Sequence, residues 1–463
     1  MLLAAATAAQ AHPPRPQQRV TTPPAQQPPT SPQQQQRERT RMAAEQQPAE
    51  PAPGQPPRRA PAPEEKAVVT HHSARIGGQQ ISYTATAATY VIKADDDTPK
   101  ASVFFVAYTK DNVPDLAKRP VSFVYNGGPG SASLFTHLGM GPRRVVLTPD
   151  GHGMPAPYSV TDDEDSNLDA TDLVFVDAIG TGYSRPAPGQ NPAQFYGIVQ
   201  DANYFADCIY QYITRNERWA SPKFLIGESY GTTRSAELAG VLQQRHQIYL
   251  NGIVLLSSVA FSNWGADDRS TFFLPTYAVT AWYHHLLPPD LQHENIESVA
   301  QAARQFAHGE YAASLEKGDQ LSPSEHQKVV QSYARFTGLS PKFIEQANLR
   351  VSPQRWFKEL ERDKRKTIGR LDSRFEGMDV DAAGERNEYD SSEASYEGAF
   401  VAAFQDYVRR ELNWHNIATE PAKSTERGEE LCIGLVEGAQ EIHRALRKRP
   451  RRVSFTGKYL CPQ

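Results

Sequence analysis

One serine of this sequence lies in a motif that is typical of nucleophilic catalysis. Residues 223–242 read KFLIGESYGTTRSAELAGVL and contain the pattern G-x-S-x-G at 227–231. The apolar run 224–226 predicts a buried strand, and Leu238, Val241 and Leu242 follow at helical spacing. A strand, a tight turn and a helix raise a serine hydroxyl above the sheet and near a helix N-terminus. We therefore predict that Ser229 is the nucleophile of an acyl-transfer reaction.

The motif by itself is a weak signal, because the same five-residue pattern also occurs as an ordinary glycine-serine turn. The strand before it and the helix after it are what favour catalysis. Ser184 also lies in a glycine-rich turn, at 179–184, but no strand-to-helix turn surrounds it. We interpret Ser184 as a loop serine.

A second glycine-rich segment, NGGPGSAS at 126–133, directly follows a predicted strand at 121–125. Glycines in such a loop let several backbone N–H groups point the same way, and this arrangement can form half of an oxyanion hole. A phosphate-binding loop is the rival interpretation, but no Lys-Ser or Lys-Thr pair follows the glycines. A plain turn-rich loop is the remaining alternative.

The elements around these motifs predict a layered α/β fold. Residues 81–93 and 101–108 predict a leading hairpin, 172–177 and 253–257 predict buried strands, and 198–212 predict an amphipathic helix. The resulting order of strand, helix, strand, helix and strand is typical of a mostly parallel sheet with helices on both faces.

Charge and composition exclude two classes of partner. The chain has 463 residues, a formal net charge of -4 and a pI near 6.4, so no basic field for nucleic acid is predicted. No apolar run reaches the length of a membrane span.

The N-terminal segment has a composition unlike the rest. Residues 1–11 resemble the end of a secretory signal peptide without its positively charged start, and we expect a protein exported to the periplasm or secreted. Residues 12–66 are rich in Pro and Gln and predict a disordered linker.

Three motifs in this order resemble the S10 serine carboxypeptidases, in particular their bacterial branch. They are NGGPGSAS at 126–133, D-x-x-G-T-G-Y-S at 177–184 and GESYG at 227–231, and the likeness extends over about 68–449. The resemblance implies an α/β-hydrolase fold with a helical cap inserted in it. The expected division is 67–263 for the first part of the core, 264–412 for the cap and 413–463 for the return to the core.

The resemblance also assigns roles to residues at matching motif positions. It makes Ser229 the nucleophile, and it gives the oxyanion hole to the backbone N–H groups of Gly128 and Tyr230. The C-terminal carboxylate of a peptide or protein substrate would be held by Asn126, Gly127 and Glu228.

Glu228 has a further expected property. A carboxyl group beside a bound carboxylate ionises at a high free-energy cost, so we expect Glu228 to keep its proton in the complex. The substrate carboxylate then receives a hydrogen bond, and activity is expected to favour acidic pH.

The sequence departs from the family at the remaining two members of the catalytic triad. The family's Asp and His come late in the chain, whereas residues 456–463 contain neither. We expect the C-terminal part of the sheet and its catalytic loops to be missing. The histidines after Ser229 are interpreted as surface or packing residues, and the triad Asp and His stay unknown. These histidines are His246, His284, His285, His293, His308, His326, His415 and His443.

No metal or organic cofactor is predicted. Cys208, Cys432 and Cys461 lack metal-ligand spacing, and one disulfide among them is compatible with their number.

Three functional hypotheses follow: a serine carboxypeptidase, an inactive relative that binds peptide ends through Asn126 and Glu228, and another α/β-hydrolase acting as an esterase or acyltransferase. Side-chain preference and oligomeric state stay open.

Overall fold

The computed structural model describes residues 62–259 and 266–415, which belong to one compact unit. Several predictions concern residues outside these ranges: the signal-like residues 1–11, most of the predicted linker, the C-terminal residues 416–463, and with them His443, Cys432 and Cys461.

A mixed sheet forms the centre of the fold, in the order β1-β2-β3-β7-β4-β9-β10, with β8 paired to β3. The first three strands are antiparallel to their neighbours, whereas β7, β4, β9 and β10 run parallel to one another. The strands are β1 Ala67–Ile76, β2 Gln79–Lys93, β3 Pro99–Lys110, β4 Val121–Tyr125, β7 Asp172–Val176, β8 Arg185–Pro186, β9 Lys223–Glu228 and β10 Gly252–Leu256. A separate pair joins β5 Arg143–Val145 to β6 Val160–Asp162.

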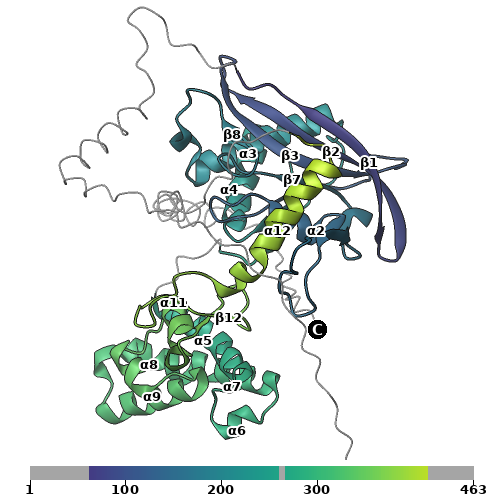
Figure 1. The fold of residues 1–463 in the computed structure, drawn as a ribbon. Coiled ribbons are helices and arrows are strands. Elements are labelled where there is room, and N and C mark those ends of the chain that lie inside the picture. Colours follow the sequence, from purple (N-terminus) through teal and green to yellow (C-terminus); the bar gives the residue numbers. More distant parts are fainter. Residues whose placement is uncertain (1–61, 260–265, 416–463) are drawn as a thin grey trace, which may run out of the picture. The chain divides into compact units, whose positions relative to one another are not determined.

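Helices cover both faces of this sheet (Figure 1). Helices α3 (Ile198–Arg215) and α4 (Tyr230–Arg245) share one apolar cluster with Phe105 and Phe123. Helices α2 (Leu134–Met140) and α12 (Ser391–Arg410) share another with Phe104 and Phe175. Adjacent residues such as Phe104 and Phe105 enter opposite clusters because successive strand side chains point to opposite faces. The predicted α/β-hydrolase fold class is confirmed.

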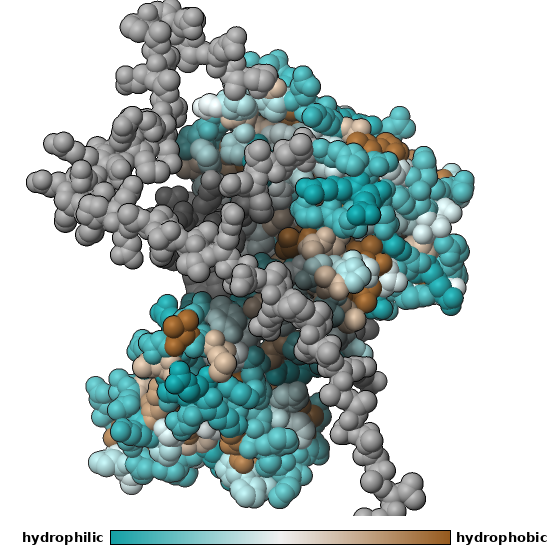
Figure 2. Space-filling view, in the orientation of Figure 1, coloured by the Kyte–Doolittle hydropathy of each residue, from teal (hydrophilic) through white to brown (hydrophobic). Residues whose placement is uncertain are grey.

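A second group of helices, here called the helical subdomain, follows in the sequence and has its own apolar core. Trp356 is fully buried in that core and stacks on Tyr277, with ring centroids 4.5 Å apart. The visible face of this group is mostly hydrophilic (Figure 2). Its helices are α5 Ala266–Tyr283, α6 Pro289–Gln292, α7 Ile296–Phe306, α8 Ala312–Lys317, α9 Pro323–Thr337, α10 Pro341–Gln346 and α11 Pro353–Glu359, and a small sheet pairs β11 Thr367–Ile368 with β12 Glu376–Gly377.

Short helical turns complete the described elements: Asn167–Asp169, Pro192–Phe195, Ala307–Tyr311, Gly318–Gln320 and Arg362–Lys364. Helix α12 packs against the face of the sheet that carries Phe104 and Phe175, through Ala403, Phe404 and Tyr407. The C-terminal half of α12, at the end of the expected 264–412 cap, therefore packs on the core, whereas Ser392 near its start accepts hydrogen bonds from the N–H groups of Leu371 and Asp372.

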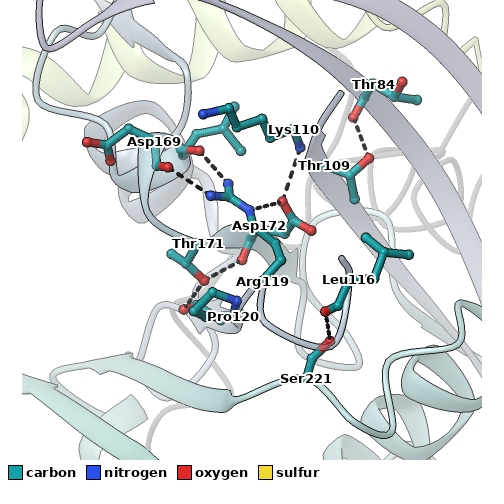
Figure 3. A network of polar contacts seen from close by, with 12 residues as sticks. Thr84, Thr109, Lys110, Leu116, Arg119, Pro120, Asp169, Thr171, Asp172 and Ser221 are labelled. Atoms are coloured by element: carbon teal, nitrogen blue, oxygen red, sulfur yellow. Dashed lines mark hydrogen bonds and ion pairs between the residues drawn. The ribbon is translucent and has the colours of Figure 1, made fainter. Parts of the chain in front are cut away.

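A buried cluster of charges holds together the ends of the strands opposite the serine. Asp172, fully buried, accepts a hydrogen bond from Arg119 Nε at 3.0 Å and another from Arg218 Nη1 at 2.5 Å. Arg119 also donates to the carbonyl oxygens of Leu168 and Asp169 (Figure 3). Buried ions need partners of this kind, because an unpaired buried charge is costly. The cluster fixes the loop that leads into β7 against the loop that leads into β4.

In the part of the chain that the structure describes, none of the helices combines the length and the apolar character that crossing a membrane requires.

Candidate active site

Ser229 occupies a sharp turn between β9 and α4. Its backbone has φ 54° and ψ -121°, a conformation that costs free energy for any residue with a Cβ. The N–H of Ser229 donates to the carbonyl oxygen of Leu256 in β10 at 2.9 Å. Helix α4 then begins at Tyr230. The strand, the strained turn and the helix expected from the sequence are therefore all present.

Glycine at 227 is required by this turn. A Cβ there would lie 2.2 Å from the carbonyl oxygen of Gly231 and 2.5 Å from Ser235 Oγ. Such distances are far inside van der Waals contact, so only glycine lets the first turn of α4 pass this close to the end of β9.

The loop after β4 lies directly against the turn that carries Ser229. A Cβ on Gly127 would be 2.4 Å from the backbone nitrogen of Tyr230 and 2.6 Å from the carbonyl oxygen of Glu228. Within the described residues, the N–H groups of Gly128 and Tyr230 donate to no backbone carbonyl. The structure thus brings together the two segments that the sequence analysis pairs, with two N–H groups available for a ligand.

Asn126, Gly127 and Glu228 also meet. Glu228 Oε2 accepts hydrogen bonds from Asn126 Nδ2 at 3.1 Å and from the N–H of Gly127 at 3.4 Å. The orientation of the Asn126 amide is set from its other side, where Oδ1 accepts from the N–H of Thr136 at 3.0 Å and from its hydroxyl at 3.1 Å. Two donors and one carboxyl group therefore converge next to Ser229.

Arg234 is a site residue that the sequence analysis missed. It is 1% exposed, its Nη1 donates to the carbonyl oxygen of Asn126 at 2.8 Å, and its Nε donates to Asp201 Oδ2 at 2.7 Å. Burial disfavours the charged guanidinium, but the Asp201 carboxylate outweighs this effect and raises the pKa of Arg234. The ion pair joins α3 and α4 to the loop after β4. No local pattern separates Arg234 from a surface arginine, since its partners lie 33 and 108 positions away.

The D-x-x-G-T-G-Y-S motif forms a structural support. The buried carboxylate of Asp177 accepts from the N–H of Ser133 at 2.9 Å, which links it to the end of the 126–133 loop. A Cβ on Gly182 would lie 1.9 Å from Asp177 Oδ2. The hydroxyl of Ser184 is fully buried and donates to the carbonyl oxygen of Asp177 at 2.8 Å, as suits a loop serine.

Within residues 62–259 and 266–415, the Ser229 hydroxyl forms no hydrogen bond with an Asp or His side chain. His246 caps the opposite end of the 16-residue helix α4, roughly 24 Å along its axis, and its Nε2 lies 3.1 Å from Asp207 Oδ1. His284 contacts the carbonyl oxygen of Ser373. The triad partners therefore stay unassigned, as the sequence analysis leaves them.

Cys208 is buried and unpaired in α3, and burial raises the pKa of its thiol to about 12. A thiol of this kind is unreactive at neutral pH.

Comparison with known proteins adds the family. The family model described as serine carboxypeptidase, peptidase S10, matches residues 79–415. A search of curated proteins found no match. Among solved structures, the carboxypeptidase Kex1Δp from Saccharomyces cerevisiae is 19% identical with a TM-score of 0.33, and the match covers 55% of this chain and 53% of that one. A proline iminopeptidase from Mycobacterium smegmatis is 16% identical with a TM-score of 0.25, covering 77% of this chain and 98% of that one.

Proposed function

The chain belongs to the serine carboxypeptidase family, and from this premise we propose that it is a hydrolase that releases C-terminal amino acids from peptides through an acyl-enzyme on Ser229. The observation that carries the proposal is the contact between the two segments of the site. Gly127 lies against the backbone of Tyr230, so the serine and the N–H groups of the glycine-rich loop come from segments in direct contact. That combination is what acyl transfer requires.

In the proposed reaction, Ser229 Oγ attacks the carbonyl carbon of the last peptide bond. The carbonyl oxygen becomes an oxyanion, which the N–H groups of Gly128 and Tyr230 stabilise. Collapse of this intermediate expels the C-terminal amino acid as the leaving amine, and water then hydrolyses the acyl-enzyme. The hydroxyl proton of Ser229 needs a base that the described residues do not supply.

The substrate's C-terminal carboxylate is proposed to bind Asn126 Nδ2 and the N–H of Gly127. In the free protein both groups donate to Glu228. A protonated Glu228 would release them and donate its own hydrogen bond to the incoming carboxylate, whereas an ionised Glu228 would repel it. Acidic pH is therefore proposed to favour binding, and free peptide C-termini are the proposed partners.

A second candidate function is binding of peptide ends without cleavage. It is favoured by the convergence of Asn126, Gly127 and Glu228, and by the lack, within residues 62–259 and 266–415, of an Asp or His side chain hydrogen-bonded to Ser229. The third hypothesis, an esterase or acyltransferase, gives no role to the convergence of Asn126, Gly127 and Glu228. We also propose export, from the signal-like residues 1–11, which lie outside the described part.

Labelling with a fluorophosphonate probe tests the proposal on the full chain. Covalent labelling of the wild type, and its loss in Ser229→Ala, is the expected result, since an activated serine attacks the probe while an ordinary serine does not. The heat-denatured wild type is the matched control and should remain unlabelled.

A cleavage assay by mass spectrometry separates the candidate functions. Release of the last residue from a free peptide, but not from its C-terminal amide, would support the carboxypeptidase. Absence of labelling combined with binding of the free peptide alone would contradict catalysis and favour the binding protein. Labelling with cleavage of simple esters and no preference for a free C-terminus would favour an esterase.

A further inference from the structure

The helical subdomain contains a cluster of one imidazole and two carboxylates that is separate from the serine. His284, Glu361 and Glu376 each offer a ligand atom, and these atoms lie within 4.8 Å of one another. His284 directly follows α5, Glu361 lies just beyond α11, and Glu376 begins β12. The three side chains come from distant parts of the sequence, so no local sequence motif predicts the cluster.

The carboxylates divide their oxygens between two kinds of neighbour. Lys364 pairs with Glu361 Oε1 at 2.6 Å, and Lys366 pairs with Glu376 Oε2. The Glu361 side chain is only 1% exposed, and its Oε2 atom has no hydrogen-bond partner within the described residues. A buried carboxylate oxygen with no donor is costly. One oxygen of each carboxylate is therefore left for something other than a lysine.

The imidazole of His284 is arranged as metal ligands usually are. Its side chain is 4% exposed, and Nε2 lies 2.7 Å from the carbonyl oxygen of Ser373, to which it can only donate. Metal-binding histidines commonly donate one ring N–H to such a carbonyl, which leaves the lone pair of the other nitrogen for the ion. The other nitrogen, Nδ1, lies 3.3 Å from Glu376 Oε1.

In a neutral His284 that donates through Nε2, the lone pair of Nδ1 faces Glu376 Oε1 at this distance of 3.3 Å, and the two repel each other. Glu361 Oε2, in the same cluster, has no hydrogen-bond partner in the described part of the chain. A cation between the three groups satisfies all of them. Two ligands about 2.05 Å from a tetrahedral zinc ion are separated by about 3.3 Å, which matches the distance from Nδ1 to Oε1.

We propose that His284, Glu361 and Glu376 bind one divalent transition-metal ion of the zinc type, with a water molecule as the fourth ligand. Imidazole and carboxylate ligands suit zinc, whereas magnesium and calcium prefer oxygen ligands alone. The ion ties the end of α5 to the segment after α11 and to β12. Its role is to stabilise the helical subdomain, independently of any chemistry at Ser229.

Metal titration of the full chain tests this site. The chelator-treated protein is titrated with Zn²⁺ against a chromophoric competitor, and we expect about one ion per chain. His284→Gln and Glu376→Gln should each weaken binding at least about tenfold, the loss that even an outer partner of a ligand produces. His293→Gln, an exposed histidine of the same subdomain, is the matched control and should bind as the wild type does. Removal of zinc should lower the melting temperature, and its return should restore it.

Replacement by Co²⁺ identifies the ligand atoms. A tetrahedral visible spectrum without a sulfur-to-cobalt charge-transfer band is expected for nitrogen and oxygen ligands. A sulfur band would assign the ion to a cysteine and overturn the proposal, as would a wild type that binds no zinc or variants that bind it unchanged. Glu376, with 30% of its side chain exposed, is the ligand whose substitution least endangers folding, so it decides the question if His284→Gln does not fold.

Discussion

Glu228 is the residue whose ionisation would control the proposed site. Its carboxyl group receives both hydrogen bonds that a substrate carboxylate would need, from Asn126 Nδ2 and the N–H of Gly127. Two carboxylates cannot share these donors unless a proton lies between them. In the free protein, Glu228 therefore occupies the two donors that the proposed substrate carboxylate would use.

Peptide affinity is expected to depend on pH through Glu228. The dissociation constant of a free peptide should rise with increasing pH, because a carboxylate at Glu228 would repel the substrate carboxylate whereas a carboxyl group would donate to it. In Glu228→Gln the side chain donates at every pH, so the affinity should vary little between pH 4 and pH 8. Fluorescence titration of the full chain measures this without requiring turnover. A C-terminally amidated peptide is the control, and a variant that keeps the wild-type pH profile would count against the role of Glu228.

At the scale of elements, the site depends on how closely two segments approach. The loop after β4 touches the first residue of α4, and Arg234 from α4 donates to the carbonyl oxygen of Asn126 in that loop. Asp201 from α3 holds Arg234 in place. Buried ion pairs of this kind fix geometry more clearly than they add stability. The separation between Ser229 and the proposed oxyanion N–H groups is thus set by glycine at 127 and by a buried arginine.

Substitution of Gly127 should disturb the site through this contact. In Gly127→Ala the added methyl group would lie 2.4 Å from the backbone nitrogen of Tyr230, so the loop must move away from the turn. We expect fluorophosphonate labelling and peptide binding to fall at least about tenfold, since small misplacements of reacting groups are costly. Gly240→Ala, in an open position of α4, is the control; it should keep both activities and raise the free energy of unfolding by about 0.5–1 kcal/mol. Equal behaviour of the two variants would contradict this account.

At the scale of the whole molecule, a buried histidine lies between the central sheet and helix α12. His137 of α2 stacks on Phe175 of β7, with ring centroids 4.5 Å apart, and its Nε2 lies 2.5 Å from the hydroxyl of Tyr108 in β3. That hydroxyl lies 2.8 Å from the hydroxyl of Tyr407 in α12. Burial lowers the pKa of His137 to about 3. The buried imidazole of His137 is therefore neutral near pH 7.

Stability should decline in acid for this reason. The folded pKa of His137 lies below the unfolded value near 6.5, so the unfolded chain binds the extra proton between these two values. The contribution is complete above about pH 6.5 and is lost as the pH falls toward 3. Between pH 7 and pH 5 it should lower the free energy of unfolding by about 2 kcal/mol.

Urea unfolding of the wild type and of His137→Gln at both pH values measures this contribution. The variant is less stable at pH 7 but should lose about 2 kcal/mol less than the wild type on acidification. His293→Gln, which changes an exposed histidine, should follow the wild type. Parallel losses in all three proteins would show that other groups govern the acid response. Acidic pH is thus proposed to strengthen peptide binding, while it is expected to lower the free energy of unfolding.

The sequence by itself determined the features that depend on neighbouring residues. The apolar run before Ser229, the glycines around it and the helical spacing after it specify a strand, a strained turn and a helix, because backbone conformation and burial of one face are local properties. The glycines of the 126–133 loop are readable for the same reason. Strand β1 was missed because most of its residues are exposed or half-buried, so it lacks an apolar alternation.

Only the tertiary structure decided which distant side chains meet. The pairing of Arg234 with Asp201, the packing of α12 under the sheet and the convergence of His284, Glu361 and Glu376 all join residues far apart in the chain. Each depends on how elements pack, and a single charged or polar residue gives no sign of its partner before the chain folds. For the same reason, histidines that are similar in the sequence serve differently here: one stabilises the core as a neutral ring, and another completes a proposed metal site.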